Sequence, residues 1–247
     1  MAPFKVIPVI DVLNSEAVHA LKGERNNYKP LKSKLFKNSD PFNILEVLAI
    51  NYKFRDFYIA DLDAIIKKSP NLQLLKKIMR ISGIKIMIDP GIVDVEDILL
   101  FSNYNIDKLI IGLETVGSLE NINKAFNIMG KNKLIVSIDM YKEKVISNAR
   151  GLRNKNIIEI TKKIGEIGIK ELILLDLFRV GQKVGGIPQQ YLEIQGSFEG
   201  NIYAGGGIKD YKDILNYKDL NFAGVLIATA LYDGTINIEK LTNFSIS

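Results

Sequence analysis

Short runs of apolar residues alternate with longer segments of mixed apolar and polar residues along the whole chain. The short runs are almost entirely apolar, which is typical of parallel strands covered on both faces. The predicted strands span 5–11, 56–61, 84–89, 107–112, 133–139, 170–176, 200–204 and 222–227. The segments between them predict helices at 41–52, 70–81, 94–103, 118–128, 155–167, 188–196, 210–216 and 237–243. Eight strand–helix units predict an α/β fold, a single (β/α)8 TIM barrel, rather than a doubly wound open sheet.

Start signals accompany three of the predicted helices. Asp40-Pro41 and Ser69-Pro70 each place a capping residue before a proline in the first helical turn. Ser118 precedes another helix and has Glu120 in its first turn. We therefore expect Asp40, Ser69 and Ser118 to cap the helices that follow them.

Internal repetition divides the chain into two similar parts. The segment from Lys5 to Gly23 aligns without a gap on the segment from Lys133 to Gly151, at an offset of 128 residues. Farther along, 89–98 matches 205–214 at an offset of 116. Repetition of this kind indicates a structural repeat. The sequence therefore predicts one domain over 1–247, built from half-barrels 1–128 and 129–247 with approximate two-fold symmetry.

Composition and charge narrow the class of protein. The chain has 247 residues, a net charge of +5 and 47% hydrophobic residues, as expected for a soluble globular protein. It has no Cys and one His, which excludes a disulfide framework and any metal site built from several Cys or His ligands. No apolar run is long enough to span a membrane and the N-terminus lacks a signal-peptide pattern, so we expect a cytoplasmic protein without a membrane partner. Basic and aromatic nucleic-acid motifs are missing, so we expect a phosphorylated small molecule as the partner and no nucleic acid.

Two aspartates are the candidate catalytic residues. Asp11 and Asp139 end the first and fifth predicted strands, which lie opposite each other in a ring of eight. In such barrels the chemistry takes place at the carboxyl ends of the strands. Opposed carboxyls suit two proton transfers on one substrate, one group acting as acid and the other as base. Aspartates after strands also cap helices, but the alternating segments 16–21 and 144–149 predict a hairpin after each of these two.

Three consecutive glycines at 205–207 follow the seventh predicted strand. Glycines allow backbone N–H groups to approach an anion, and barrels often bind phosphate in the loops after strands 7 and 8. A tight strand-to-helix turn is the alternative explanation, but it does not need three glycines. A short helix beginning within 229–232 would add its N-terminus to the site. The predicted phosphate-binding residues are Gly206, Gly207, Ala228 and Thr229.

The segment 89–91 matches 205–207 in the repeat, but it is a weaker candidate for a phosphate site. Asp89 and Pro90 replace two of the three glycines, an aspartate repels an anion, and proline has no N–H to donate. Gly91, Gly112 and Thr115 remain as candidates for a second phosphate. We therefore expect a ligand held by one firm phosphate site and one weakened site.

The remaining candidates lie in loops or end other strands. The loop 12–39 holds six basic residues, Arg25 among them, and its length predicts that it covers the mouth of the barrel, although a charge run is most often a solvated loop. His19 is either a packing residue or a phosphate contact. The segment 178–187 has glycines near both ends, as lids do. Its Arg179 either contacts an anionic substrate or faces water, and the strand-ending Asp61 and Asp176 are further candidates for substrate binding.

Several motifs resemble those of a known family. The runs IPVIDV…AVHALKG, ADLDA, GGGI and ALYDG resemble the paired histidine-biosynthesis barrels, which are the phosphoribosylformimino-aminoimidazole-carboxamide ribotide isomerase and the synthase subunit that follows it. The resemblance covers essentially the whole chain and is closer to the isomerase. The run GERNNYKPLKS looks like an archaeal branch of uncharacterised isomerase-related proteins from methanogens.

The resemblance implies a function. In the isomerase the matching aspartates, here Asp11 and Asp139, are the acid–base pair of an Amadori rearrangement, an aldose–ketose isomerisation that needs no metal or organic cofactor. It also implies that Asp176 orients the substrate. The family usually has GGGIR where this chain has DPGIV, and a basic residue at the position of His19. These departures favour a paralogue that acts on a different phosphoribosyl-type sugar. The two implied phosphate sites are Gly91 with Gly112, and Gly206-Gly207 with Ala228-Thr229.

Two other functions stay open. A lyase or cyclase like the synthase subunit would use the same aspartates and would need ammonia from a glutaminase, a partner that we do not expect. A barrel that has lost its reaction and only binds a phosphorylated metabolite is favoured by the DPG sequence at 89–91. The intact Asp11 and Asp139 count against such a binder, because it has no need of opposed carboxyls.

Overall fold

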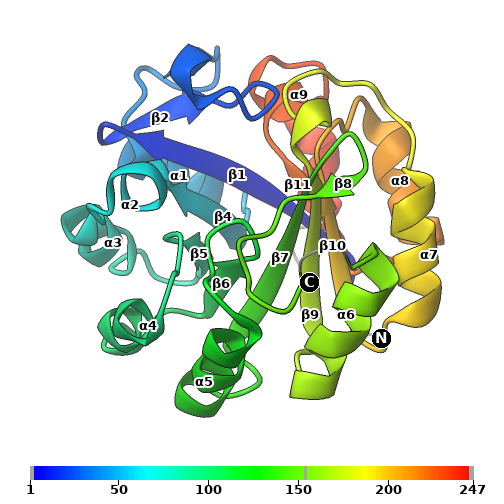
Figure 1. Ribbon diagram of the computed structural model, residues 1–247. Helices are drawn as coiled ribbons and strands as arrows, with labels where there is room; N and C mark the ends of the chain where they lie inside the picture. Colours follow the sequence, from blue (N-terminus) through cyan, green and yellow to red (C-terminus); the bar gives the residue numbers. More distant parts are fainter. Residues whose placement is uncertain (1–2, 153–154, 245–247) are drawn as a thin grey trace.

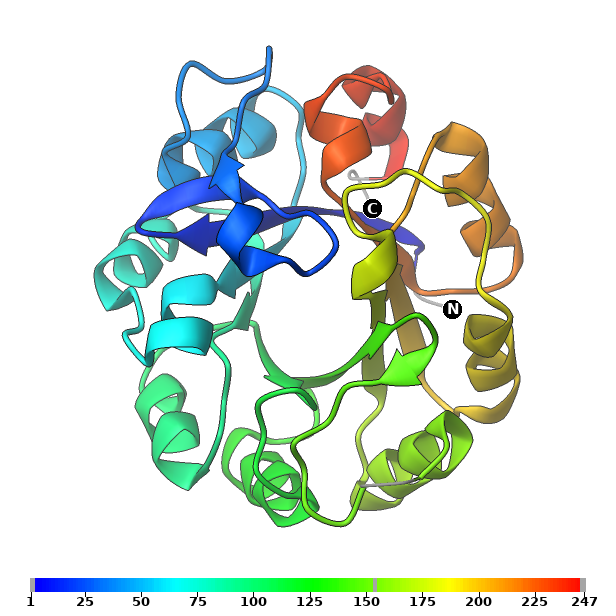
Figure 2. The same ribbon diagram turned by 45° about the horizontal axis from the view of Figure 1, so that its top comes forward.

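The computed structural model describes residues 3–152 and 155–244, in which eight parallel strands form a closed barrel (Figures 1 and 2). Pairing of β1 with β11, with Lys5 opposite Gly224, closes the ring. The predicted (β/α)8 barrel is therefore confirmed. In ring order the strands are β1 (Lys5–Leu13), β4 (Asp56–Asp61), β5 (Lys85–Asp89), β6 (Lys108–Gly112), β7 (Leu134–Tyr141), β9 (Glu171–Asp176), β10 (Asn201–Gly205) and β11 (Gly224–Ile227).

Helices surround the strands on the outside of the barrel (Figure 2). No helix in the described part of the chain has the length and apolar character that a membrane crossing requires. The last predicted helix, at 237–243, is instead a 3-10 helix. The α-helices are α1 (Pro41–Ile50), α2 (Leu62–Lys67), α3 (Leu72–Ile78), α4 (Val95–Ser102), α5 (Leu119–Met129), α6 (Ile157–Ile167), α7 (Gln189–Ser197), α8 (Tyr211–Asp219) and α9 (Thr229–Tyr232). The 3-10 helices are η1 (Arg25–Asn27), η2 (Leu177–Arg179) and η3 (Ile238–Phe244).

Two of the three predicted caps are confirmed. The side chains of Asp40 and Ser118 accept hydrogen bonds from backbone N–H groups in the first turns of α1 and α5. The prediction for Ser69 is wrong, because Asn71 caps α3 by accepting from the N–H of Leu74 at 3.1 Å. The reason is the unexpected helix α2, which ends at Lys67 and is followed by Lys68 in a left-handed conformation, so that Ser69 lies in the turn between two helices.

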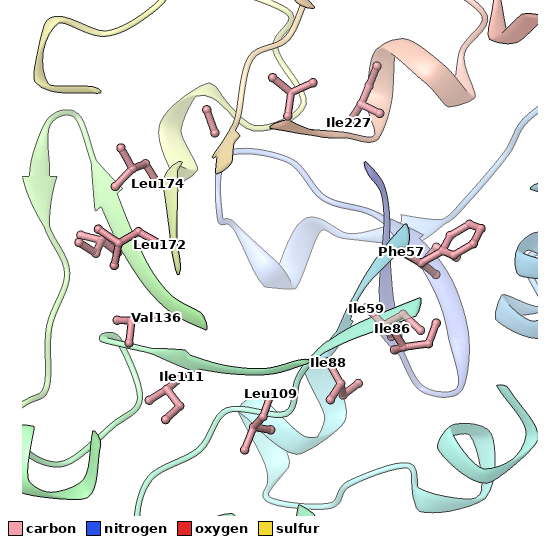
Figure 3. Packing of buried hydrophobic residues seen from close by; sticks show 14 of the residues in the cluster. Phe57, Ile59, Ile86, Ile88, Leu109, Ile111, Val136, Leu172, Leu174 and Ile227 are labelled. Atoms are coloured by element: carbon pink, nitrogen blue, oxygen red, sulfur yellow. The ribbon is translucent and has the colours of Figure 1, made fainter. Parts of the chain in front are cut away.

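Successive residues of each barrel strand alternate between two apolar cores, as the two-residue period of a strand requires. One set points outward and packs against the helices, and Figure 3 shows part of it, including Phe57, Ile59 and Leu172. The other set points into the barrel and packs in its interior. The inward layer takes one residue from each strand: Ile7, Tyr58, Met87, Ile110, Ile135, Ile173, Tyr203 and Leu226.

Both predicted hairpins are present. β1 continues two residues beyond Asp11 and pairs with β2 (Glu16–His19), which pairs in turn with β3 (Lys29–Pro30). β7 continues beyond Asp139 and pairs with β8 (Lys144–Val145). The two aspartates therefore lie within extended strands and not at strand ends. Both hairpin turns have two successive residues with positive φ, as tight hairpins prefer: Asn14 and Ser15, then Lys142 and Glu143, again 128 residues apart.

The second repeat also has matching hydrogen bonds. The N–H of Val93 donates to Asp97 Oδ2 at 2.8 Å, and the N–H of Lys209, 116 residues later, donates to Asp213 Oδ2 at 2.9 Å. The proposed boundary after residue 128 falls inside α5, which ends at Met129. The division into half-barrels stays a prediction, with its natural cut at the turn that follows α5.

Candidate active site

A cavity of about 920 Å³, counted out to its open mouth, lies at the carboxyl ends of the barrel strands. Strand period decides which side chains reach it. Asp11 lies four residues beyond the inward-facing Ile7 on β1, and Asp139 lies four beyond the inward-facing Ile135 on β7, so both carboxyls point into the barrel. Both line the cavity, and their strands stand opposite each other in the ring. The structure thus brings the two candidate acids together.

Neither carboxyl forms an ion pair with any residue in the described ranges 3–152 and 155–244. Asp139 is 5% exposed, and its Oδ1 accepts a hydrogen bond from Ser137 Oγ at 2.9 Å. Burial raises the pKa of Asp11 to about 7, although the nearby guanidinium of Arg25 lowers it. Burial, together with the charges of Glu114 and Asp89, raises the pKa of Asp139 well above its usual range. Both groups therefore hold their protons to higher pH than an ordinary aspartate does.

Asp89 is a third inward-facing acid of the cavity. Its Oδ2 accepts from the hydroxyl of Tyr58 at 3.1 Å, and its Oδ1 accepts from the N–H of Gly91 at 3.0 Å. Burial raises its pKa to about 6. The carboxyl of Asp89 therefore already accepts the hydrogen bond of the Gly91 N–H, which a phosphate at this place would need as a donor.

The structure does not bring the three residues predicted for a second phosphate into the cavity. Gly91 is packed under α2, because a Cβ on it would lie 2.8 Å from the Cα of Ile65. Thr115 donates its hydroxyl to the carbonyl oxygen of Gly112 at 3.2 Å. None of Gly91, Gly112 and Thr115 is part of the cavity wall. The unexpected helix α2 and the Asp89 carboxyl together fill the place that the repeat predicted for a phosphate.

The residues predicted for the first phosphate all line the cavity: Gly206, Gly207, Ala228 and Thr229. Both glycines have left-handed φ angles of 85° and 86°, and a Cβ on Gly207 would lie 2.9 Å from Val184. This backbone therefore requires glycine. His19 reaches the same place, with its Nε2 3.1 Å from the hydroxyl oxygen of Thr229.

Asp61, Asp176 and Arg179 were expected to bind substrate, and none of them lines the cavity. Asp61 and Asp176 occupy outward positions of their strands, one residue after the inward-facing Ala60 and Leu175. Each caps a helix instead, by accepting from the N–H of Ala64 and of Phe178 at 3.0 Å. Arg179 donates to the carbonyl oxygens of Gly185 and Gly186 at 2.6 and 2.7 Å, which holds its own loop together.

Two loops cover part of the cavity. The loop after β1 and the loop after β9 lie at the same end of the barrel (Figure 2), and the N–H of Lys22 donates to the carbonyl oxygen of Val180 at 3.0 Å. A Cβ on Gly23 would lie 3.2 Å from Leu177, so the two loops are in close contact. The predicted position of the loop 12–39 over the mouth agrees with this arrangement.

Sequence reasoning missed an ion pair in the cavity wall. Arg25 Nη2 lies 2.5 Å from Glu114 Oε1, and both residues line the cavity. Arg25 was counted only as one charge among six in its loop, and nothing distinguished Glu114. The one available signal was that Arg25 matches Arg153 at the repeat offset of 128, and Arg153 lies outside the described residues. Within the described part of the chain, no group of three or more His, Asp and Glu is suited to hold a metal ion.

Comparison with known proteins places this barrel in a family. The family model described as histidine biosynthesis protein matches residues 5–237, so the chain belongs to that family. The relative from Lactococcus lactis subsp. lactis is 1-(5-phosphoribosyl)-5-((5-phosphoribosylamino)methylideneamino)imidazole-4-carboxamide isomerase, 28% identical over 240 residues that cover 96% of this chain and 97% of its own. An isomerase of the same name from Clostridium kluyveri is 28% identical over 242 residues, which cover 95% and 96% of the two chains.

An archaeal relative is similar to the same extent. An uncharacterised protein of Methanocaldococcus jannaschii is 30% identical over 244 residues, which cover 97% of this chain and 98% of its own. The resemblance seen in the motifs, to the isomerase and to an archaeal branch, is therefore confirmed. Similarity to isomerases of the family extends over nearly the whole chain.

Proposed function

We propose that the protein is an intramolecular aldose–ketose isomerase that acts on a phosphoribosyl-type sugar held by a single phosphate, with Asp11 and Asp139 as its acid–base pair. The observation that carries this proposal is that the two carboxyls face one cavity from opposite strands without a basic partner among the described residues. The isomerase names of relatives that match the chain from end to end support it.

The reaction needs two proton transfers and no net change in protons. One carboxyl protonates the ring oxygen of an aminoaldose, and the ring opens as the nitrogen lone pair forms a C=N bond. The other carboxylate removes the proton from the neighbouring carbon, which gives an enolaminol. This intermediate tautomerises to the aminoketose as its hydroxyl loses a proton and the first carbon gains one. A carboxyl with a raised pKa holds its proton to higher pH than an ordinary aspartate, which suits a group that must give or take a proton. Burial raises the pKa of both Asp11 and Asp139.

The glycine-rich part of the cavity wall is the proposed phosphate-binding site. Gly206, Gly207, Ala228 and Thr229 meet at one end of the cavity, where Lys183 also lines the wall. At the opposite end the Asp89 carboxyl already accepts from the N–H of Gly91, and Ile65 of α2 packs against that glycine, so Gly91 has no free N–H for a second phosphate. A substrate with one phosphate therefore suits this cavity better than the doubly phosphorylated compound named for the relatives.

The test is turnover measured on both kinds of compound. Purified protein is incubated with N-substituted 5-phosphoribosylamines and with the doubly phosphorylated compound, and ¹³C NMR follows conversion of the aldose to the ketose. We expect turnover of a singly phosphorylated compound. Asp11→Asn and Asp139→Asn should each reduce kcat by about 100-fold or more while binding is retained.

Asp219→Asn is the matched control, because Asp219 is exposed at the end of α8 on the outside of the barrel. Normal turnover by either cavity variant would contradict the proposal. Binding of phosphosugars by the wild-type protein with no turnover of any of them would instead indicate a barrel that only binds its ligand.

A further inference from the structure

The proposed phosphate-binding site is supported, on the side away from the cavity, by the loop that follows β9. The N–H of Gly185 in that loop donates to the carbonyl oxygen of Gly207 at 2.9 Å. Gly207 lines the cavity, whereas Gly185 does not, so the carbonyl of Gly207 points away from the cavity. In a planar trans peptide the N–H of the next residue points the opposite way. The N–H of Ile208 is therefore directed towards the cavity.

The N–H of Ile208 is available to a ligand. Ile208 is buried and lines the cavity beside Gly206 and Gly207. Within residues 3–152 and 155–244, the N–H groups of Gly207 and Ile208 have no acceptor on the protein. A buried N–H without an acceptor is costly, and an anion bound in front of it would supply the missing acceptor. The proposed phosphate-binding site therefore depends on how the peptide between Gly207 and Ile208 is oriented.

The side chain of Arg179 holds Gly185 and Gly186 in place. Arg179 Nη2 donates to the carbonyl oxygens of these two glycines at 2.6 and 2.7 Å. The same side chain packs against the phosphate loop, because a Cβ on Gly207 would lie 3.1 Å from both Cβ and Nε of Arg179. Arg179 Nε also lies 3.5 Å from the carbonyl oxygen of Gly206. The guanidinium thus joins the two loops from outside the cavity, whose wall it does not line.

Asp213 holds the same two loops from the first turn of α8. It is 8% exposed, its Oδ1 accepts from the N–H of Gly186 at 3.0 Å, and its Oδ2 accepts from the N–H of Lys209 at 2.9 Å. One carboxylate therefore ties the loop after β9 to the segment that carries the proposed phosphate site. Among the described residues, the matching Asp97 of the other half accepts from the N–H of Val93 alone. The second contact is found only on the side of the barrel with the intact glycine run.

Arg179 and Asp213 carry opposite charges but act on the backbone in the same way. Neither forms an ion pair with any residue of 3–152 and 155–244. Within these ranges, every hydrogen bond of the two side chains is made with a backbone group. Hydrogen bonds from charged groups are stronger than those between neutral groups. The two side chains are therefore suited to fix one backbone conformation.

We propose that Arg179 and Asp213 are positioning residues of the phosphate site, which fix the peptide between Gly207 and Ile208 with its N–H directed at the bound anion. The inference rests on the glycine-rich phosphate site of the proposed function. It adds two residues that do not line the cavity and act on the ligand only through the backbone. The contact with an anionic substrate that was expected of Arg179 is thus an indirect one.

The test uses inorganic phosphate and needs no sugar substrate. Calorimetry measures the affinity of the full chain for phosphate, and ¹H–¹⁵N NMR follows the amide signal of Ile208, which we expect to move as phosphate is added. Arg179→Gln should lower the affinity about tenfold and reduce the movement of this signal. Arg179→Lys can still donate from one nitrogen to both carbonyl oxygens, so it should restore part of the affinity.

Asp213→Asn distinguishes positioning from a general effect of charge. If only charge mattered, removal of a negative charge near the site would strengthen phosphate binding. The amide nitrogen of asparagine cannot accept a hydrogen bond, so one of the two N–H groups, of Gly186 or of Lys209, loses its acceptor. Positioning therefore predicts the opposite sign, a loss of phosphate affinity of about threefold or more.

Arg55→Gln is the matched control. Arg55 is an exposed arginine directly before β4, at the amino ends of the barrel strands, and its Nη1 lies 3.5 Å from the carbonyl oxygen of Gly83. The substitution removes the same charge as Arg179→Gln at the end of the barrel opposite the cavity. It should leave the affinity for phosphate and the response of the Ile208 signal unchanged.

The proposal is overturned if Arg179→Gln binds phosphate as the wild type does, if Asp213→Asn binds it more tightly, or if phosphate leaves the Ile208 signal in place. Either variant decides alone if the other does not fold. These outcomes do not bear on the two catalytic carboxyls of the proposed function. Conversely, the expected losses of phosphate affinity in a protein that turns over no sugar would support this inference and contradict the proposed isomerase.

Discussion

At the scale of single residues, strand period explains which predicted side chains reach the site. Asp11, Asp89 and Asp139 all stand at inward positions, whereas Asp61 and Asp176 stand at outward positions and cap helices. The sequence contains this information, because parity along each apolar run separates the two groups. It does not contain the Arg25–Glu114 pair, since that contact depends on the path of a long loop.

The raised pKa of Asp11 has a consequence for stability. A carboxyl with a pKa of about 7 in the folded protein and 3.8 when unfolded binds more protons in the folded state between these values. Its favourable contribution to folding is therefore complete below about pH 4 and is lost as pH rises through 7. We expect Asp11→Asn to increase the free energy of unfolding by about 1–2 kcal/mol at pH 8, with little change at pH 4.

Urea denaturation of both proteins at the two pH values measures this effect. Asp219→Asn serves again as the control on the outer surface. An Asp11→Asn variant that is less stable than the wild type at pH 8 would show that the charged carboxyl of Asp11 does not lower the free energy of unfolding.

Gly207 provides a second prediction at this scale. Gly207→Ala places a Cβ 2.9 Å from Val184 in a left-handed backbone, so it should disturb the proposed phosphate-binding site. We expect calorimetry to show that the affinity for inorganic phosphate falls about tenfold or more. Gly234→Ala is the control, because its φ is 78° and no atom lies within 4 Å of its added Cβ. Equal affinity for phosphate in the two variants would show that phosphate does not bind at Gly207.

At the scale of elements, apolar runs located all eight strands to within two residues at each end, and β1 and β7 each run two residues past the predicted end into a hairpin. A strand buried on both faces is a continuous apolar run, so its first residue is easy to locate in the sequence. In a hairpin, apolar and polar residues alternate, so the residue at which the barrel strand ends is harder to locate. The sequence did not predict α2 because this helix is only about one and a half turns long and follows β4 directly. Because α2 occupies the segment before it, α3 starts at Leu72 with Asn71 as its cap. The same helix α2 packs against Gly91 at the place predicted for a second phosphate.

The start of α3 is testable by substitution. Asn71→Ala removes the side-chain oxygen that accepts from the N–H of Leu74, which should cost about 1 kcal/mol of unfolding free energy. Ser69→Ala, two residues earlier in an exposed turn, should change the stability by less than about 0.5 kcal/mol. Chemical denaturation of both variants distinguishes the two caps, and a larger loss for Ser69→Ala would contradict the assignment of the helix start.

At the scale of the whole molecule, the ring is closed by the pairing of β1 with β11, and the repeat places matching hairpins on opposite sides. Each proposed half contributes four barrel strands and would expose two unpaired edges and an apolar inner face when alone. We expect fragments cut after Gly130 to aggregate or self-associate separately and to form a one-to-one complex when co-expressed. Size-exclusion chromatography with light scattering checks this, and a monomeric, cooperatively folded single fragment would contradict the expectation that each half needs a partner to cover its edges.

The closed second phosphate place limits how this chain can change by mutation. Asp89 takes the amide of Gly91, and Ile65 independently packs against the same glycine. Glycine at position 89 alone would free the N–H of Gly91 but would leave Ile65 packed against that glycine. A smaller residue at position 65 alone would remove this packing but would leave the negative carboxyl of Asp89 beside the site. Under the proposed single-phosphate function, neither replacement alone opens a second phosphate site, so a change to a doubly anchored substrate requires both replacements together.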